Sequence, residues 1–239
     1  DYELVGVFSR TSASAEKTAT AAGCKACASL DELLALEPEY LVEAASVEAV
    51  RTLSIPALRR GVNLVVLSIG AFADQAFYEQ VQAAAREGGA RVHLTSGAIG
   101  GFDVLQTISL MAEAQGLPET AGIQTHTGAR GFRNTPVWDE HLLTDAAEST
   151  VFTGNAKQAI ATFPRRVNVA VATALATTGP ENTGVVMNSV PGWVGDDHCI
   201  TAEIEGTKAV VDICARNSAI AAWSAVALLR NLASPICFY

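Results

Sequence analysis

The chain is poor in charged residues, and poorest in basic ones. Asp, Glu, Lys and Arg make up 17% of its 239 residues, with 16 Lys and Arg against 25 Asp and Glu. The formal net charge of −9 at pH 7 argues against nucleic acid or an anionic membrane as the main partner. Such a small charged fraction also indicates that a partner subunit covers part of the surface.

Long hydrophobic runs are absent as well. No apolar stretch reaches the roughly 18 residues that predict a membrane-spanning helix, and no basic-then-apolar signal segment opens the chain. The five cysteines include the pair Cys24 and Cys27, but no second pair stands at the spacing that zinc needs. We interpret them as ordinary thiols of a reducing compartment, and we expect a soluble, cytoplasmic protein without a metal site.

Several catalytic motifs are missing. The chain contains no G-x-S-x-G, no H-E-x-x-H and no P-loop, which argues against the hydrolase, metalloprotease and nucleotide-hydrolysing classes that use them. The dinucleotide fingerprint G-x-G-x-x-G is absent too. The glycine-rich stretch "TSGAIGGFDVLQ" at 95–106 resembles a phosphate-binding turn, but its glycines have a different spacing.

The pattern that is present alternates apolar strands with helices. The strands are apolar on both faces, as in a parallel sheet that helices cover on both sides. A Rossmann-like dinucleotide-binding domain over residues 1–97 is therefore predicted. Its expected strands are 3–8, 39–45, 62–70 and 90–97, and its expected helices are 15–23, 30–38, 46–61 and 74–89.

The end of the 3–8 strand carries a prediction about the cofactor. In a Rossmann domain, the residue that binds the adenosine ribose follows the second strand, and here Ser9 and Arg10 would hold that place. We therefore expect a first strand, glycine loop and helix upstream of residue 1. An arginine and a hydroxyl suit a 2′-phosphate, so the pair favours NADP or tolerance of both NAD and NADP. The alternative is an ordinary polar turn.

Small residues also follow the later strands of this domain. Crevices for cofactor and substrate lie at the carboxyl ends of parallel strands, where small residues let a nicotinamide ring approach the backbone. We expect these strand-end residues to face the crevice: Ser46, Ser68, Gly70, Ser96, Gly97 and Ala98.

The second half has a different pattern. Residues 98–217 mix helices with strands in hairpin order, including a predicted hairpin over 198–214 with its turn at Glu205 and Gly206. This indicates an α+β catalytic and dimerisation domain, whose open sheet face would suit a homodimer. The apolar helix 218–233 can pack back on either domain.

Four histidines are candidates for acid–base chemistry. His93 lies in an apolar strand and is expected to be packed there, while His141 is expected at the surface. His126 follows a strand and can line the crevice. His198 stands after "VGDD", where two carboxylates can fix its tautomer or raise its pKa. The alternative, which we expect for at least one of Asp196 and Asp197, is a solvated turn carboxylate.

Several segments together resemble the L-aspartate dehydrogenases: "LVEAAS", "VVLSIGAFAD", "TSGAIGGFD", "FPRRVNVAVATALA" and the isolated His198. The resemblance implies NAD(P)-dependent oxidative deamination of L-aspartate, through iminoaspartate, to oxaloacetate or towards NAD biosynthesis. It also implies that His198 is the catalytic histidine and that Ala98 and Asn168 contact the cofactor. From position alone, Asn168 is equally a helix cap.

The sequence also departs from this family. Asp196 stands where an Asn is usual, Cys199 follows the histidine in place of Glu, "THTGARGF" replaces a Lys-Pro segment, and a loop before the last helix is missing. These departures keep two alternatives open: an NAD(P)-dependent oxidoreductase acting on a hydroxy acid or an imine, or a non-catalytic nucleotide-binding relative. The candidate cations for substrate carboxylates are Arg130, Arg133, Arg165 and Arg166.

Overall fold

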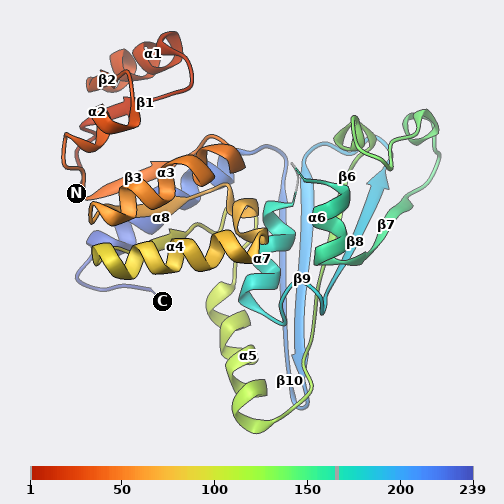
Figure 1. The fold of residues 1–239 in the computed structure, drawn as a ribbon. Coiled ribbons are helices and arrows are strands. Elements are labelled where there is room, and N and C mark those ends of the chain that lie inside the picture. The colour runs from red at the N-terminus through yellow and green to blue at the C-terminus, as the bar shows by residue number, and fades with distance from the viewer. Residues whose placement is uncertain (1, 165–166, 239) are drawn as a thin grey trace.

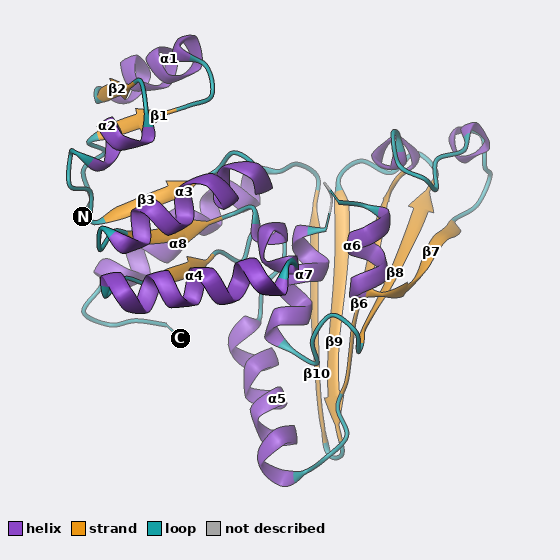
Figure 2. Cartoon of the chain, in the orientation of Figure 1, coloured by secondary structure: helices purple, strands orange, loops and turns teal. Residues whose placement is uncertain are grey.

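The computed structural model of the chain describes residues 2–164 and 167–238 (Figures 1 and 2). Its first half alternates short parallel strands with helices, as the sequence predicts. The elements in order are β1 (Gly6–Phe8), α1 (Ser12–Ala22), β2 (Lys25–Cys27), α2 (Leu30–Leu34), β3 (Tyr40–Glu43), α3 (Val47–Arg59), β4 (Asn63–Val66), the 3-10 helix η1 (Ile69–Ala73), α4 (Gln75–Gly88) and β5 (Val92–Leu94).

The central strand β4 explains why this half is layered. Leu64, Val65 and Val66 are all fully buried, so both faces of the strand are covered. On one side of the sheet, α3 and α4 pack closely against each other. Their backbones approach so closely that a Cβ at Gly88 would lie only 1.8 Å from the Leu58 carbonyl oxygen. A glycine is therefore required where these two helices meet.

The parallel strands form two separate sheets rather than the single sheet that the sequence pattern suggests. One sheet is β1-β2 and the other is β3-β4-β5, and in the described residues β1 and β3 each keep one edge unpaired. In Figure 1 the β1–α2 unit accordingly lies away from the second sheet. The strand order of a doubly wound sheet puts one strand between these two edges. The expected upstream strand stays a prediction.

The second half is built on a mixed sheet. Its strand order is β10-β9-β6-β8-β7, with β6 and β8 parallel and the other neighbours antiparallel. Its elements in order are α5 (Phe102–Gln115), β6 (Thr120–Gly128), the 3-10 helices η2 (Ala129–Phe132) and η3 (Glu140–Leu143), β7 (Ser149–Asn155), α6 (Ala156–Thr162), α7 (Asn168–Ala176), β8 (Thr183–Val190), β9 (Asp196–Ile204), β10 (Thr207–Ala215) and α8 (Ala219–Ala233).

The predicted hairpin is confirmed. β9 and β10 pair antiparallel around Glu205 and Gly206, and Gly206 has the positive φ of 80° that such a turn requires. Alternation along β9 buries His198 and Ile200 on the face that α5 and α7 cover, and it turns Asp197 to the opposite face. The sheet thus has a helix-covered face and an open face (Figure 1).

The two halves join through one hydrophobic core. That core runs from Leu58 and Leu64 of the first half to Val171 and Ile200 of the second, and α7 packs on η1. The last helix, α8, returns to the junction, where Ser224 Oγ accepts a hydrogen bond of 3.1 Å from the Gly97 N–H. None of the helices in the described ranges combines the length and hydropathy that a membrane span requires.

Candidate active site at the junction of the two halves

Two serine-containing turns follow the carboxyl ends of β3 and β4. Ser46 is the N-cap of α3, and its Oγ accepts a hydrogen bond of 3.2 Å from the Ala49 N–H. Ser68 is the N-cap residue of η1, and its Oγ donates to Glu43 Oε1 at 2.9 Å. Both hydroxyls are therefore engaged within the protein, so the expected cofactor contacts at these positions would come from their turns rather than from free hydroxyl groups.

Glu43 is a functional candidate that the sequence motifs do not single out. Its side chain is 2% exposed at the end of β3. Oε1 accepts from the Ala45 and Ser46 N–H groups at 2.7 and 2.8 Å, and Oε2 accepts from the Ser68 N–H at 2.9 Å. The available signal was a carboxylate ending an otherwise apolar strand, since a buried charge of this kind needs donors around it.

Asn168 and Gly70 meet across the junction of the two halves. Asn168 Oδ1 accepts a hydrogen bond of 2.8 Å from the Gly70 N–H. A Cβ at Gly70 would lie 2.9 Å from that oxygen and 3.3 Å from Val47 Cγ2, so the close approach favours glycine. Asn168 begins α7 without capping it, because the N-cap is Val167 and makes no side-chain bond. The structure thus brings together two of the predicted cofactor residues.

The glycine-rich crossover forms a tight turn after β5. The Ile99 N–H donates to the Ser96 carbonyl at 3.0 Å, which closes a turn around Gly97 and the half-buried Ala98. Gly97 has a φ of 61°, a conformation that favours glycine, and a Cβ there would meet nothing within 4 Å. The turn therefore borders open space, and Thr95 just before it bonds to Val66 at the end of β4.

Ser9 and Arg10 lie apart from these residues. They follow β1, in the two-stranded sheet, with Ser9 half-buried and Arg10 exposed. Arg10 has no ion-pair partner among the described residues. The structure therefore does not bring them together with Gly70 and Asn168, although a dinucleotide has two distant ends that an extended crevice would accommodate.

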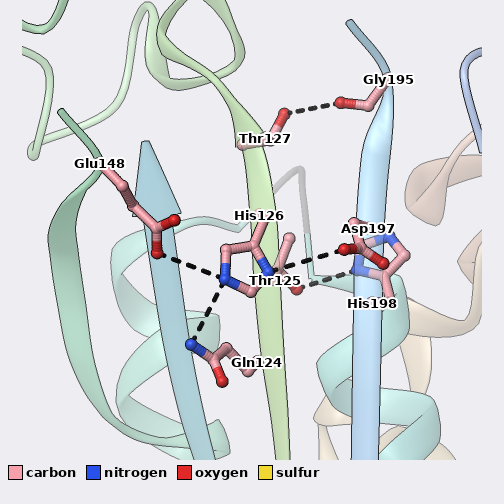
Figure 3. A network of polar contacts seen from close by, with 8 residues as sticks. All are labelled: Gln124, Thr125, His126, Thr127, Glu148, Gly195, Asp197 and His198. Carbon is pink, nitrogen blue, oxygen red and sulfur yellow. Dashed lines mark hydrogen bonds and ion pairs between the residues drawn. The ribbon is translucent and has the colours of Figure 1, made fainter. Parts of the chain in front are cut away.

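His198 is buried and held by one neighbour (Figure 3). Its exposed fraction is 6%, and its Nδ1 lies 2.9 Å from Thr125 Oγ1 on β6. In the described part of the chain Nε2 has no hydrogen-bond partner. Burial lowers the pKa of His198 below its usual range, and it outweighs the charges of Asp196 and Asp197, which act in the opposite direction. The neutral imidazole is therefore favoured.

Asp197 is not the group that fixes the His198 ring, because among the described residues it makes no hydrogen bond to His198. Asp197 lies on the open face of the sheet, where its Oδ2 is 3.9 Å from His126 Nδ1 (Figure 3). The other ring nitrogen of His126 is 3.3 Å from Glu148 Oε1. Burial and the neighbouring Asp212 raise the pKa of Asp197. Alternation along β6 and β9 places His126 and Asp197 on the open face of the sheet and Thr125 and His198 on the helix-covered face.

The remaining candidates divide clearly. His93 packs beside Tyr40, with ring centres 6.0 Å apart, and His141 is exposed and 3.3 Å from Asp145. Arg133 lies over the Trp138 ring at 5.5 Å. Arg130 is exposed in η2. The candidates Arg165 and Arg166 lie outside the described residues. Within those residues no group of three or more His, Cys, Asp or Glu side chains is arranged to hold a metal ion.

These residues fit a nicotinamide dinucleotide. The carboxyl ends of three parallel strands meet beside Gly70 and Gly97, where a Cβ would crowd Asn168 or strain the backbone. Asn168 keeps its amide N–H group without a partner among the described residues, so it can donate to a ligand. A buried histidine, with one ring nitrogen that no described residue engages, completes a site that can bind a cofactor and move a proton.

Known proteins match both halves. The model described as "Aspartate dehydrogenase, C-terminal" matches residues 108–232, and "Homoserine dehydrogenase, NAD binding domain" matches residues 1–95. The L-aspartate dehydrogenase of Methanococcus maripaludis strain C5 is 30% identical, over 98% of this chain and 88% of the relative. That of Ruegeria pomeroyi is 36% identical, over 86% of this chain and 76% of the relative.

A solved structure agrees with these matches. The aspartate dehydrogenase of Thermotoga maritima superposes with a TM-score of 0.77 at 26% identity, covering 100% of this chain and 91% of that one. A hyperthermophilic archaeal homoserine dehydrogenase, at 12% identity and a TM-score of 0.56 over 94% of this chain and 84% of that one, shares the fold alone. The Rossmann-like domain, the second α/β domain and the predicted resemblance are thereby confirmed. The chain belongs to the aspartate dehydrogenase family.

Proposed function

We propose that this chain catalyses the NAD(P)-dependent oxidative deamination of L-aspartate to oxaloacetate and ammonia. The observation that carries the proposal is a buried histidine, His198, in a member of this family: Thr125 engages one ring nitrogen, and the other has no partner among the described residues. We assign the cofactor to residues 1–97 and catalysis to residues 98–217, with the 218–233 helix beside the cofactor domain through Ser224.

When bound, the nicotinamide supplies the hydride acceptor. The protein then has two proton tasks. Iminoaspartate forms when Cα loses a hydride and the amino group loses a proton, and water then adds to the imine carbon to release ammonia and oxaloacetate. We assign both proton transfers to Nε2 of His198, which has no hydrogen-bond partner among the described residues and is the basic nitrogen in the tautomer whose Nδ1–H donates to Thr125 Oγ1. The low pKa of the buried ring keeps this base neutral near pH 7.

Asn168 would hold the nicotinamide end of the cofactor. Its Oδ1 is fixed by the Gly70 N–H, so its N–H group points in a defined direction and can donate to the carboxamide. The turns at Ser46, Ser68 and Gly97–Ala98 would border the ring. Ser9 and Arg10 would bind the adenosine ribose or its 2′-phosphate, which favours NADP or the use of both cofactors.

A substrate panel tests this function. L-aspartate should reduce NAD or NADP, followed by absorbance at 340 nm, while malate and other amino acids should be poor substrates. Reduction by a hydroxy acid without reduction by aspartate would favour the alternative oxidoreductase. No turnover, but retained nucleotide binding, would favour the non-catalytic relative. Supply of iminoaspartate to NAD biosynthesis stays a prediction, which the product of the aspartate reaction would test.

We also propose a homodimer that pairs through the open face of the five-stranded sheet. Val210 on this face is 56% exposed, and the helices cover only the opposite face. Sedimentation of the wild type and of Val210→Glu, which should dissociate the dimer, tests the interface. The net charge of −9 supports the absence of nucleic-acid binding. Five cysteines without a disulfide support a cytoplasmic location.

A further inference from the structure

The carboxylate of Glu43 is buried without a cation. Its side chain is 2% exposed, and it has no ion-pair partner in the described part of the chain. A buried charge without a cation costs stability, and an apolar residue would serve this core position better. Glu43 should therefore do something beyond filling the core.

Among the described residues, the side-chain hydrogen bonds of Glu43 all go to the turns that follow β3 and β4. Oε1 accepts from the Ala45 N–H, the Ser46 N–H and Ser68 Oγ, and Oε2 accepts from the Ser68 N–H. Every partner is a donor, which matches the acceptor-only chemistry of an ionised carboxylate. One side chain thus fixes the distance between the turn after β3 and the turn after β4.

The contact continues to the other half of the molecule. Ser68 directly precedes η1 as its N-cap, Gly70 lies within η1, and the Gly70 N–H donates to Asn168 Oδ1 on α7. The position of Ser68 therefore sets where Gly70 meets Asn168. Glu43 is connected to Asn168 through Ser68 and one turn of backbone.

We propose that Glu43 is a positioning residue of the cofactor site: it holds the turns at Ser46 and Ser68 so that η1 presents Gly70 to Asn168 and leaves the crevice open to the nicotinamide end of NAD(P). The inference rests on the proposed function. Glu43 itself touches neither cofactor nor substrate, and it acts through the turns.

The direct test is Glu43→Gln in the purified protein. The amide keeps the size of the side chain but replaces one acceptor oxygen with a donor, so at least one N–H or O–H group faces a donor. The dissociation constant of NADH or NADPH, followed by cofactor fluorescence, should rise about tenfold or more, which is the worth of a hydrogen bond to a charged group. The KM for aspartate at saturating cofactor should stay within about twofold, because Glu43 does not contact the substrate.

Two further variants complete the test. Glu48→Gln removes an exposed carboxylate from the first turn of α3 and should leave cofactor affinity unchanged. Ser68→Ala removes only the hydroxyl bond and keeps the Ser68 N–H bond. It should weaken cofactor binding by a smaller factor at an unchanged unfolding midpoint. If Glu43→Gln fails to fold, the cofactor affinity of Ser68→Ala tests the positioning role of Glu43.

The outcomes separate this inference from the proposed function. A folded Glu43→Gln or Ser68→Ala protein with wild-type cofactor affinity would overturn the positioning role alone. An equal loss of affinity in Glu48→Gln would also overturn it, because a general charge effect would then explain the result. A wild-type protein that binds neither NADH nor NADPH would overturn the proposed function, and this inference with it.

Discussion

Asn168 Oδ1 and the Gly70 N–H form a hydrogen bond of 2.8 Å between residues that are 98 positions apart in the chain. Gly70 belongs to the turn after β4, and Asn168 begins α7 beside the five-stranded sheet. The bond therefore joins the half expected to bind the cofactor to the half that contains His198. It also leaves the amide N–H group of Asn168 without a partner among the described residues, so this group can donate to a ligand.

Substitution of Asn168 separates these two tasks. Asp keeps an oxygen that accepts from Gly70 but loses the amide donor, whereas Ala loses both. If the amide donates to the nicotinamide, both variants should bind NADH up to about tenfold more weakly, the range for the loss of one hydrogen bond at this exposed residue. Wild-type affinity in Asn168→Asp, measured by fluorescence titration, would limit Asn168 to joining the two halves.

Thr125 should control the tautomer of His198. Thr125→Val keeps the shape of the side chain but leaves the buried Nδ1 without its 2.9 Å partner. The kcat should fall about tenfold to a hundredfold with cofactor affinity unchanged, while Thr125→Ser should keep most of the activity. Nitrogen chemical shifts of His198 give the tautomer directly. Equal kcat values for the Val and Ser variants would contradict the assignment.

The lowered pKa of His198 makes stability depend on pH. Between the ordinary histidine value of about 6.5 and the lower folded pKa, the unfolded chain binds a proton that the folded chain does not. The stabilisation that His198 gives to the folded state is complete above about pH 6.5 and is lost as the pH falls below that value. The free energy of unfolding then changes by at most about 1.4 kcal/mol per pH unit. Urea unfolding of the wild type between pH 7 and 5 should show this loss.

His198→Asn is the matched comparison for that measurement. His93 also has a pKa lowered by burial, so part of the pH dependence remains in the variant. The free energy of unfolding should therefore fall less steeply with decreasing pH in His198→Asn than in the wild type. Parallel curves for the two proteins would show that His198 titrates normally in the folded state.

Arg10 should set the choice between NADP and NAD. Arg10→Asp exchanges a cation for a carboxylate that accepts from a ribose 2′-hydroxyl and repels a 2′-phosphate. The kcat/KM for NADP should fall about tenfold to a hundredfold relative to that for NAD, the range for one charged contact. Lys17→Ala, on the exposed face of α1, is the control. An unchanged ratio of kcat/KM for NADP to that for NAD would show that Arg10 belongs to an ordinary surface turn without a role in cofactor choice.

The elements that follow from local pattern are the ones the sequence predicts well. The apolar run at β4 and the hairpin around Gly206 follow from burial on two faces and from turn chemistry. The glycine-rich crossover likewise forms the expected turn. The contact between Gly70 and Asn168 is different, because nothing in their separation of 98 residues indicates it.

The sequence predicts the partners of buried polar groups poorly. Adjacency to "VGDD" suggests that Asp197 supports His198, but strand alternation turns the two to opposite faces, and Thr125 arrives from another strand. Glu43 looks like any strand-end acid until the turns that fold around it are known. Such contacts depend on tertiary packing, which single-sequence patterns do not contain.

The most direct test of the account is the rate of aspartate-dependent NAD(P)H formation by the wild type and by His198→Ala, with cofactor affinity measured on the same samples. We expect the wild type to turn over L-aspartate and the variant to lose about a hundredfold to ten-thousandfold in kcat, the range for a general base. Its cofactor affinity should be unchanged. Turnover of aspartate by a folded His198→Ala protein within about threefold of the wild type would contradict the assignment of His198 as the base.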